Sequence, residues 1–364
     1  MAIASSSASP LGGSNDSATA TRQSSTSLNG YDIVASYHSQ LASSFSLPPP
    51  IASIFALCDL IAQVPSNTTS ELITLLRTHS DRLKQSLPNP IPATAGLDLF
   101  ARLVITMQWD ASADFAFQKK KLVDLAREFA EKTVPSCRDK ITELAMPFIR
   151  DKSIILTHSY SRVVMQILLS AQARGLDINV YVTESRPGGL GIKTYNELTQ
   201  AGIPTTVLCD SAAAFVGEKV DFVLVGAEGV CESGGILNAV GTLGLALVAK
   251  YYGKPFYAAA ESFKFLRIFP LSQFDLPSSR PTLTFPDQED LINEATQKQS
   301  TPTIDTKKQT TTNSKLMTSA MEEKNPQIDY TKPDLITFIF SDVGSLRPSG
   351  VGDALLAVYG GNAD

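Results

Sequence analysis

Polar side chains follow four short apolar segments in the second half of the chain. They lie within Thr157–Tyr160, Thr183–Pro187, Gly226–Gly229 and Gly234–Thr242. These segments offer hydroxyl, guanidinium, carboxylate and amide groups beside glycine-rich turns, a combination that suits a small phosphorylated polyol. The ligand pocket that we predict contains the following residues: His158, Ser159, Arg186, Glu228, Asn238, Gly241 and Thr242.

Each of these residues also has an ordinary structural explanation. A histidine at a strand end, such as His158, is more often a hydrogen-bonded turn residue than a base. Glu228 can cap the turn after its strand, and Arg186 can pair with a surface acid. Ser159 stands beside His158 but has no evident acid to orient that histidine, and no cysteine neighbours a histidine. We therefore predict a binding site without catalytic residues.

Motifs for nucleotides and metals are absent from the sequence. The segment 188–194 (GGLGIKT) does not have the P-loop spacing, and no predicted strand is followed by GxGxxG. The four cysteines are far apart and the chain has three histidines, whereas a zinc site needs clustered ligands. We expect no nucleotide hydrolysis, no metal and no cofactor.

The elements that would position the pocket differ between the two halves of the chain. From residue 31 to about 150, apolar residues recur at helical spacing, for example at Leu72, Leu76 and Leu83, and predict an all-helical domain. After residue 150, short β-branched segments alternate with helices. The predicted strands are Ser153–Thr157, Ile178–Thr183, Thr205–Leu208, Asp221–Gly226, Pro255–Ala260 and Leu335–Phe340.

Strands that are apolar on both faces and joined by helices require a mostly parallel sheet covered on each side. We therefore predict an α/β fold in which the helical domain precedes a Rossmann-like, doubly wound domain at 151–364. Ligands of such sheets gather outside the carboxyl ends of the strands, where the predicted pocket residues stand. We expect residues 1–30 to be a disordered tail and the polar segment at about 278–327 to be a disordered insertion.

Composition limits the partners. The net charge of −5 provides no basic patch for nucleic acid. No apolar segment is long enough to cross a membrane, and residues 1–30 do not resemble a targeting signal. We expect a cytosolic protein that acts through protein contacts. A large apolar content between Phe256 and Phe269 suggests that the second domain forms a homodimer.

Several segments resemble a known family. ILTHSYSRVV, TESRPGG, GAEGVCESGGILNAVGT, AESFKF and YTKPDLITFIFSDVG are similar to the alpha subunits of eukaryotic translation initiation factor two B. The resemblance runs from about Tyr31 to the end, apart from the insertion. It extends to a superfamily that includes the beta and delta subunits and sugar-phosphate aldose–ketose isomerases, such as methylthioribose-1-phosphate isomerase.

The resemblance implies that the isomerase chemistry is lost. The isomerases have a catalytic cysteine and a catalytic aspartate at the positions that Ser159 and Glu228 occupy, and a lysine at the position of Ala239. A hydroxyl cannot replace a thiol, and a longer carboxylate misplaces the proton acceptor by a distance to which proton transfer is sensitive. A vestigial pocket for a sugar phosphate could remain.

The resemblance further implies a regulatory subunit of the guanine-nucleotide exchange factor for initiation factor two. Such a subunit homodimerises and joins the beta, gamma, delta and epsilon subunits into a decamer, in which epsilon is catalytic. It senses the phosphorylated alpha chain of the initiation factor. Two alternatives remain: an active sugar-phosphate isomerase, and a metabolite-sensing subunit that keeps the pocket.

Overall fold

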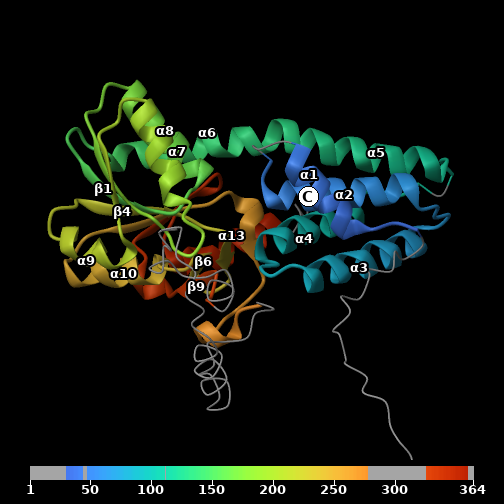
Figure 1. Cartoon of the computed structure of the whole chain (residues 1–364). Helices are drawn as coiled ribbons and strands as arrows, with labels where there is room; N and C mark the ends of the chain where they lie inside the picture. The colour runs from blue at the N-terminus through green and yellow to red at the C-terminus, as the bar shows by residue number, and fades with distance from the viewer. Residues whose placement is uncertain (1–29, 44–46, 111, 278–324, 360–364) are drawn as a thin grey trace, which may run out of the picture.

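The computed structural model describes residues 30–43, 47–110, 112–277 and 325–359. They form a helical part and an α/β part that meet along one junction (Figure 1). The predicted tail, except for residue 30, and the predicted insertion, except for residues 325–327, lie outside the described residues.

The helical part is built around one apolar helix. Its elements are α1 (Ile33–Ser43), α2 (Pro49–Gln63), α3 (Thr69–Ser86), α4 (Ile91–Thr106) and α5 (Phe115–Glu128). Helix α2 packs against the other four, and its Leu57 and Leu60 are fully buried. Helix α3 begins at a side-chain cap: the hydroxyl of Thr68 accepts a hydrogen bond from the backbone amide of Glu71.

A nearly continuous helix connects the two parts. After α5 the chain makes one wide turn, η1 (Phe129–Thr133), and continues as α6 (Val134–Ala145) and a short turn, η2 (Met146–Phe148). Pro135 has no amide proton to donate to the preceding turn, which explains the break in the regular helix. Helix α6 packs against α7 and β10 of the α/β part. The domain boundary at residue 150 stays a prediction. Helix α6, which precedes it in the sequence, covers one face of the sheet.

The α/β part contains a sheet of seven strands. They are β1 (Ile154–His158), β2 (Asn179–Thr183), β3 (Thr205–Leu208), β4 (Phe222–Gly226), β7 (Phe256–Ala259), β10 (Phe338–Ser341) and β11 (Gly344–Leu346). Their order is β11-β10-β7-β4-β1-β2-β3, and every neighbouring pair is parallel except β10 with β11. The chain starts at the centre and winds outward in both directions, so the predicted doubly wound fold is confirmed.

Helices cover both faces of this sheet (Figure 1). Successive strand residues point to opposite faces, so Ile155 and Leu156 belong to different cores. One face packs on α6, α7 (Arg162–Ala173) and α8 (Gly191–Gln200). The other face packs on α9 (Ala213–Val216), α10 (Thr242–Tyr251) and α13 (Val351–Tyr359). This arrangement explains why the strands are apolar on both sides.

Strand β10 differs slightly from the prediction. It begins at Phe338 rather than at Leu335, because the turn η6 (Pro333–Leu335) precedes it. The proline fixes the backbone of this turn and has no amide proton for a strand ladder. Apolar residues in the turn therefore look like strand residues in the sequence.

A second sheet of four strands lies at the junction, and the sequence analysis did not predict it. It consists of β5 (Gly229–Cys231), β6 (Ile236–Ala239), β8 (Phe265–Leu266) and β9 (Ile328–Thr331) in the order β8-β5-β6-β9. The segment Gly234–Thr242, which we predicted to follow a strand, thus includes a strand of its own. These strands are only two to four residues long, too short for an alternation of apolar and polar residues to be visible.

This second sheet also corrects the reason for expecting a homodimer. Most of the apolar side chains between Phe256 and Phe269 are used within the chain. Phe263 enters the helical core, and Phe265 packs beneath the first sheet. In this segment only Phe269 is largely exposed, at 63%.

In the described part of the chain, no helix has both the length and the apolar character needed to cross a membrane.

Candidate functional site

A cavity of about 470 Å³ opens where the helical part meets the carboxyl ends of the strands. We call it the junction pocket. Its lining includes two groups of residues, which we call the sheet wall and the junction wall. The sheet wall consists of Ser159, Arg186 and Asn238. The junction wall consists of Asn89, Arg138, Glu228, Glu261 and Lys264.

The structure brings the seven predicted residues to one place, but in two layers. Ser159, Arg186, Glu228 and Asn238 line the pocket. The other three lie behind this lining and contact one another or the lining residues. They are His158, Gly241 and Thr242.

His158 is a buried supporting residue. Its Nδ1 lies 2.6 Å from the Thr183 hydroxyl oxygen, and its Nε2 lies 2.9 Å from the Val240 carbonyl oxygen. A carbonyl can only accept, so Nε2 bears the proton and Nδ1 accepts from Thr183. Burial lowers the pKa of His158 below its usual range, and nearby Asp210 only partly opposes this. The imidazole is therefore neutral, and both of its nitrogens are engaged.

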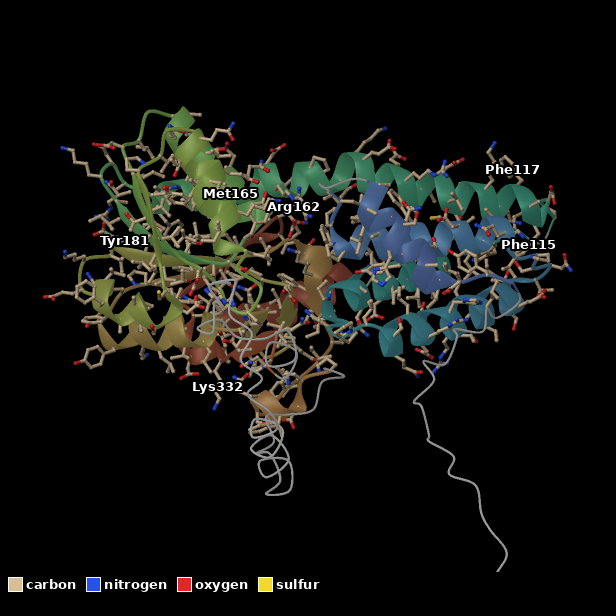
Figure 2. The ribbon with its side chains drawn as sticks, viewed as in Figure 1. Phe115, Phe117, Arg162, Met165, Tyr181 and Lys332 are labelled. Atoms are coloured by element: carbon tan, nitrogen blue, oxygen red, sulfur yellow. The ribbon has the colours of Figure 1, made fainter. Side chains whose placement is uncertain are left out.

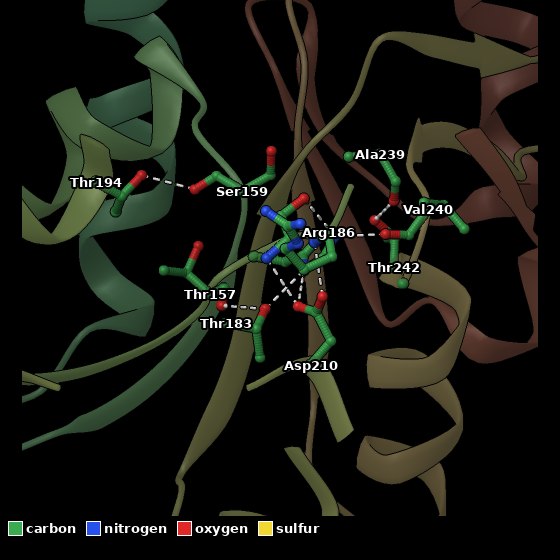
Figure 3. Close-up of polar contacts among 12 residues, drawn as sticks. Thr157, Ser159, Thr183, Arg186, Thr194, Asp210, Ala239, Val240 and Thr242 are labelled. Carbon is green, nitrogen blue, oxygen red and sulfur yellow. Dashed lines mark hydrogen bonds and ion pairs between the residues drawn. The ribbon is translucent and has the colours of Figure 1, made fainter. Parts of the chain in front are cut away.

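Asp210 shapes the turn that follows β2. Its carboxylate accepts from the Ser185 amide at 2.8 Å and from the Arg186 amide at 2.7 Å. Figure 3 shows Asp210 beneath the Arg186 side chain. Ser185 and Ser159 both have left-handed backbones, with φ of 63° and 59°. Such strained residues cluster at ligand sites, and here Asp210 stabilises one of them.

The start of α10 forms the base of the sheet wall. Gly241 has φ of 109°, and a Cβ there would lie 2.8 Å from His158 Cε1, so this position requires glycine. Asn238 donates to the Thr242 hydroxyl at 3.0 Å, and that hydroxyl donates to the Ala239 carbonyl at 2.7 Å. These two hydrogen bonds hold the side-chain amide of Asn238 in place at the pocket.

Asp329 in β9 stabilises the same helix end. Its Oδ2 accepts from the amides of Gly241 and Leu243, at 2.8 and 3.0 Å. Burial raises the pKa of Asp329 to about 7, although these two amides oppose the shift. The sequence analysis missed this residue, because it follows the predicted insertion and is distant in sequence from Gly241.

The junction wall contains two acids in different electrostatic environments. Glu228 accepts from the Asn89 amide at 2.6 Å, and burial raises the pKa of its carboxyl. Glu261 is also buried, but ion pairs with Lys264 at 2.8 Å and Arg138 at 3.0 Å outweigh burial and lower its pKa to about 2. Both acids connect the helical part to the α/β part through polar contacts.

Two further cations at the pocket were not among the predicted residues. Arg162 at the start of α7 donates to the Leu47 carbonyl at 3.2 Å. Lys193 lies 4.0 Å from the centre of the Tyr160 ring and 3.8 Å from Glu197. Lys193 is in the glycine-rich segment that the sequence analysis rejected as a P-loop. No sequence pattern marks Arg138 or Asn89, because their position at the pocket depends on how the two parts pack.

Comparison with known proteins places the chain in a family. The profile of the initiation factor 2 subunit family matches residues 46–348. The chain belongs to this family.

The relatives of this chain include both translation factors and enzymes. Translation initiation factor eIF2B subunit alpha of Dictyostelium discoideum is 36% identical, over 90% of this chain and 96% of the relative. A putative methylthioribose-1-phosphate isomerase of Methanocaldococcus jannaschii is 32% identical, over 63% of this chain and 66% of the relative.

A solved structure from the initiation factor group has the same fold. The crystal structure of the tetrameric eIF2B-beta2-delta2 complex from C. thermophilum matches with a TM-score of 0.65 and 18% identity, over 90% of this chain and 96% of that chain. At this identity the likeness concerns the fold alone.

Two groups at the junction pocket that could transfer protons, His158 and Glu228, are engaged in hydrogen bonds within the chain. A serine beside a histidine needs that histidine as a free base, yet the ring nitrogens of His158 already contact Thr183 and Val240. Glu228 is partly buried, and its carboxylate accepts a hydrogen bond from the side-chain amide of Asn89. The polar and cationic lining suits a small anionic ligand.

Proposed function

We propose that this chain is a regulatory, non-catalytic subunit of the guanine-nucleotide exchange factor for eukaryotic initiation factor two. The observation that supports it most is the similarity to a relative named eIF2B subunit alpha, which extends over 90% of the chain. The proposed partners are the beta, gamma, delta and epsilon subunits and the phosphorylated alpha chain of the initiation factor. The proposed location is the cytosol.

The absence of catalysis is part of the proposal. It rests on the resemblance described above, which implies that Ser159, Glu228 and Ala239 replace a cysteine, an aspartate and a lysine of the isomerases. Incubation with methylthioribose-1-phosphate or ribose-1,5-bisphosphate should give no ketose above background, with an isomerase relative as positive control. Turnover on the order of 1 s⁻¹ would be enzymatic and would overturn this part of the proposal.

The regulatory role is tested by reconstitution. The exchange complex is assembled with and without this chain, and nucleotide exchange is measured on phosphorylated and unphosphorylated initiation factor. We expect basal exchange to persist without the chain and inhibition by the phosphorylated factor to disappear. A phosphoserine adds roughly −1.5 to −2 charge and three acceptors, enough to create a new docking contact. Unchanged inhibition without the chain would contradict a sensing role.

Homodimerisation through the α/β part is the proposed mode of assembly. Three exposed apolar side chains follow one another closely in this part: Phe269, Leu271 and Phe274, at 63%, 76% and 76% exposure. Light scattering at micromolar concentration should give about twice the 39.1 kDa chain mass. A monomer would contradict the proposal, and Phe274→Ser tests whether these side chains lie in the interface.

A second candidate function is that the junction pocket still binds a sugar phosphate. The specific observation that favours it is that the cavity remains open and is lined by polar groups of both parts. In this proposal the ligand reports on metabolism to the exchange complex. It is compatible with the regulatory role.

A further inference from the structure

A second cavity lies at the end of the first sheet where its central strands begin. It has a volume of about 640 Å³ and is lined by residues of the turn 150–153 and of the start of β4 and β7. We call it the amino-end cavity. Sites for small molecules usually have volumes of roughly 300 to 1,000 Å³, so this cavity is large enough for a ligand.

The amino-end cavity is separate from the junction pocket, which lies at the carboxyl ends of the strands. Arg162, which follows β1, lies at the junction of the two parts, whereas Tyr181, midway along the neighbouring β2, lies farther from the helical part (Figure 2). The amino ends of these strands therefore face away from the junction. The two cavities have no lining residue in common.

Half of the residues that line the amino-end cavity contain a ring. They are Pro147, Phe148, Phe222, Pro255 and Tyr257. The ring centroids of Phe148 and Phe222 each lie 5.5 Å from that of Tyr257, so these side chains hold one another in place. A preformed apolar wall of this kind suits a flat apolar group such as an aromatic ring.

Tyr257 presents an unused hydroxyl to this cavity. The residue is only 8% exposed, and within the described part of the chain its hydroxyl has no hydrogen-bond partner, although buried tyrosines usually have one. The hydroxyl oxygen is not among the fully enclosed polar atoms, and Tyr257 lines the cavity, so the hydroxyl opens onto it. Burial raises the pKa of Tyr257, so the hydroxyl is protonated at neutral pH and can donate a hydrogen bond.

Two cations of the amino-end cavity have no partner acid. Arg150 and Lys152 line the cavity, and neither forms an ion pair with another described residue. The acids of the lining, Asp151 and Asp221, accept hydrogen bonds from backbone amides at 2.8 and 2.7 Å. The positive charge of Arg150 partly opposes the effect of burial on the pKa of Tyr257, which indicates that the guanidinium lies near the hydroxyl.

We propose that the amino-end cavity binds a small ligand that combines a planar apolar ring with an anionic group. The hydroxyl of Tyr257 and the guanidinium of Arg150 bind the anionic group, and the ring packs on Phe148. A guanidinium forms strong, charge-assisted hydrogen bonds with carboxylates and phosphates alike. The ligand class is therefore an aromatic carboxylate or an aromatic phosphate. This inference is independent of the proposed regulatory function and of any ligand in the junction pocket.

The test uses the full chain and four probes in ligand-observed NMR titrations. Benzoate and phenyl phosphate combine a ring with an anion, benzamide has the ring without the charge, and acetate has the charge without the ring. We expect benzoate or phenyl phosphate to bind with a Kd on the order of 1 mM, and the tighter of the two shows which anion the site prefers. Benzamide and acetate should bind at least about tenfold more weakly.

Two variants locate the bound probe. Tyr257→Phe removes only a hydroxyl and Arg150→Gln removes only a charge, and each should weaken binding of the tighter probe about tenfold. Tyr181→Phe is the matched control, because Tyr181 belongs to the same sheet but does not line the amino-end cavity. It should bind within about twofold of the original chain, since distant sites rarely couple. Urea unfolding verifies that each variant is folded, and Tyr257→Phe should be as stable as the original chain because its hydroxyl has no partner within the described chain.

Three results would overturn the proposal. The first is that neither benzoate nor phenyl phosphate binds at concentrations up to about 10 mM. The second is that benzamide binds as tightly as both anions, which would show that the anionic group is not recognised. The third is unchanged affinity in Tyr257→Phe and Arg150→Gln, and a loss of affinity in Arg186→Gln would then place the probe in the junction pocket. None of these results affects the reconstitution test of the regulatory role.

Discussion

The two walls of the junction pocket are built in different ways. Residues of the sheet wall follow strands, and hydrogen bonds from behind the wall support them, for example those that Asp210 accepts from the turn after β2. The junction wall contains charged residues, and its two best-placed cations surround one buried carboxylate, Glu261. The sheet wall thus depends on the turns that follow the strands, whereas the ion pairs of the junction wall depend on the contact between the two parts.

The largest expected effect is on the junction wall. Glu261→Ala removes a carboxylate that is 1% exposed and leaves Arg138 and Lys264 partly buried, close together and without this shared acid. Breaking one partner of a buried ion pair costs about 3 to 5 kcal/mol of unfolding free energy. Urea denaturation measures the loss. Glu128→Ala is the control, because Glu128 pairs with Lys132 on the surface and should change stability by less than about 0.5 kcal/mol.

The same carboxylate predicts an acid limit of stability. The pKa of Glu261 is about 2 in the folded chain and lies near the usual value when unfolded. Its contribution is therefore fully present above the unfolded pKa and is lost as the pH falls toward 2. If the unfolding free energies of the original chain and of Glu261→Ala stayed equally far apart from pH 6 to pH 3, the ion pairs would not be the cause.

On the sheet wall, the largest effect should come from Gly241→Ala. The new Cβ would lie 2.8 Å from His158 Cε1, on a backbone with φ of 109°. Steric overlap and an unfavourable backbone together should cost about 2 to 3 kcal/mol. Gly244→Ala in the same helix is the matched control. Nothing lies within 4 Å of its Cβ, so it should be neutral or stabilise by roughly 0.5 to 1 kcal/mol.

A smaller effect concerns the acid beneath the sheet wall. Because burial raises the pKa of Asp329 to about 7, the folded chain binds its proton more tightly than the unfolded chain does. Stability from this group is present below the unfolded pKa and is lost as the pH rises through 7. Asp329→Asn should therefore be more stable than the original chain by about 1 kcal/mol at pH 8, and less so at pH 5. Equal differences at both pH values would show that Asp329 does not titrate in this range.

The smallest expected effect is that of Lys193→Gln. Lys193 is half exposed, and its ion pair with Glu197 and its contact with Tyr160 are both near solvent. Its loss should change the unfolding free energy by less than about 1 kcal/mol. Urea denaturation of Lys193→Gln and of the original chain measures the change. A loss above about 2 kcal/mol would show that these contacts are shielded from solvent.

The sequence was sufficient to predict the first, mostly parallel sheet and the edge at which its strands end. The parallel strands are apolar on both sides, and the residues after β1, β2 and β4 must meet at one edge of the sheet. The partners of His158 could not be predicted, because Val240 comes from a loop between the second sheet and α10. Arg138 and Asn89 reach the pocket only through the packing of the helical part, which leaves no periodic pattern.

The position of Phe263 has a consequence for protein synthesis. Its ring packs in the core of the helical part with Phe129, at a centroid distance of 6.0 Å. Domains generally fold in order of emergence from the ribosome. The helical segment leaves the ribosome before Phe263 does. Until Phe263 has been synthesised, the core of the nascent helical part therefore lacks this side chain. A truncated chain that ends near residue 150 should therefore expose apolar surface and bind chaperones, even though all its helices are present.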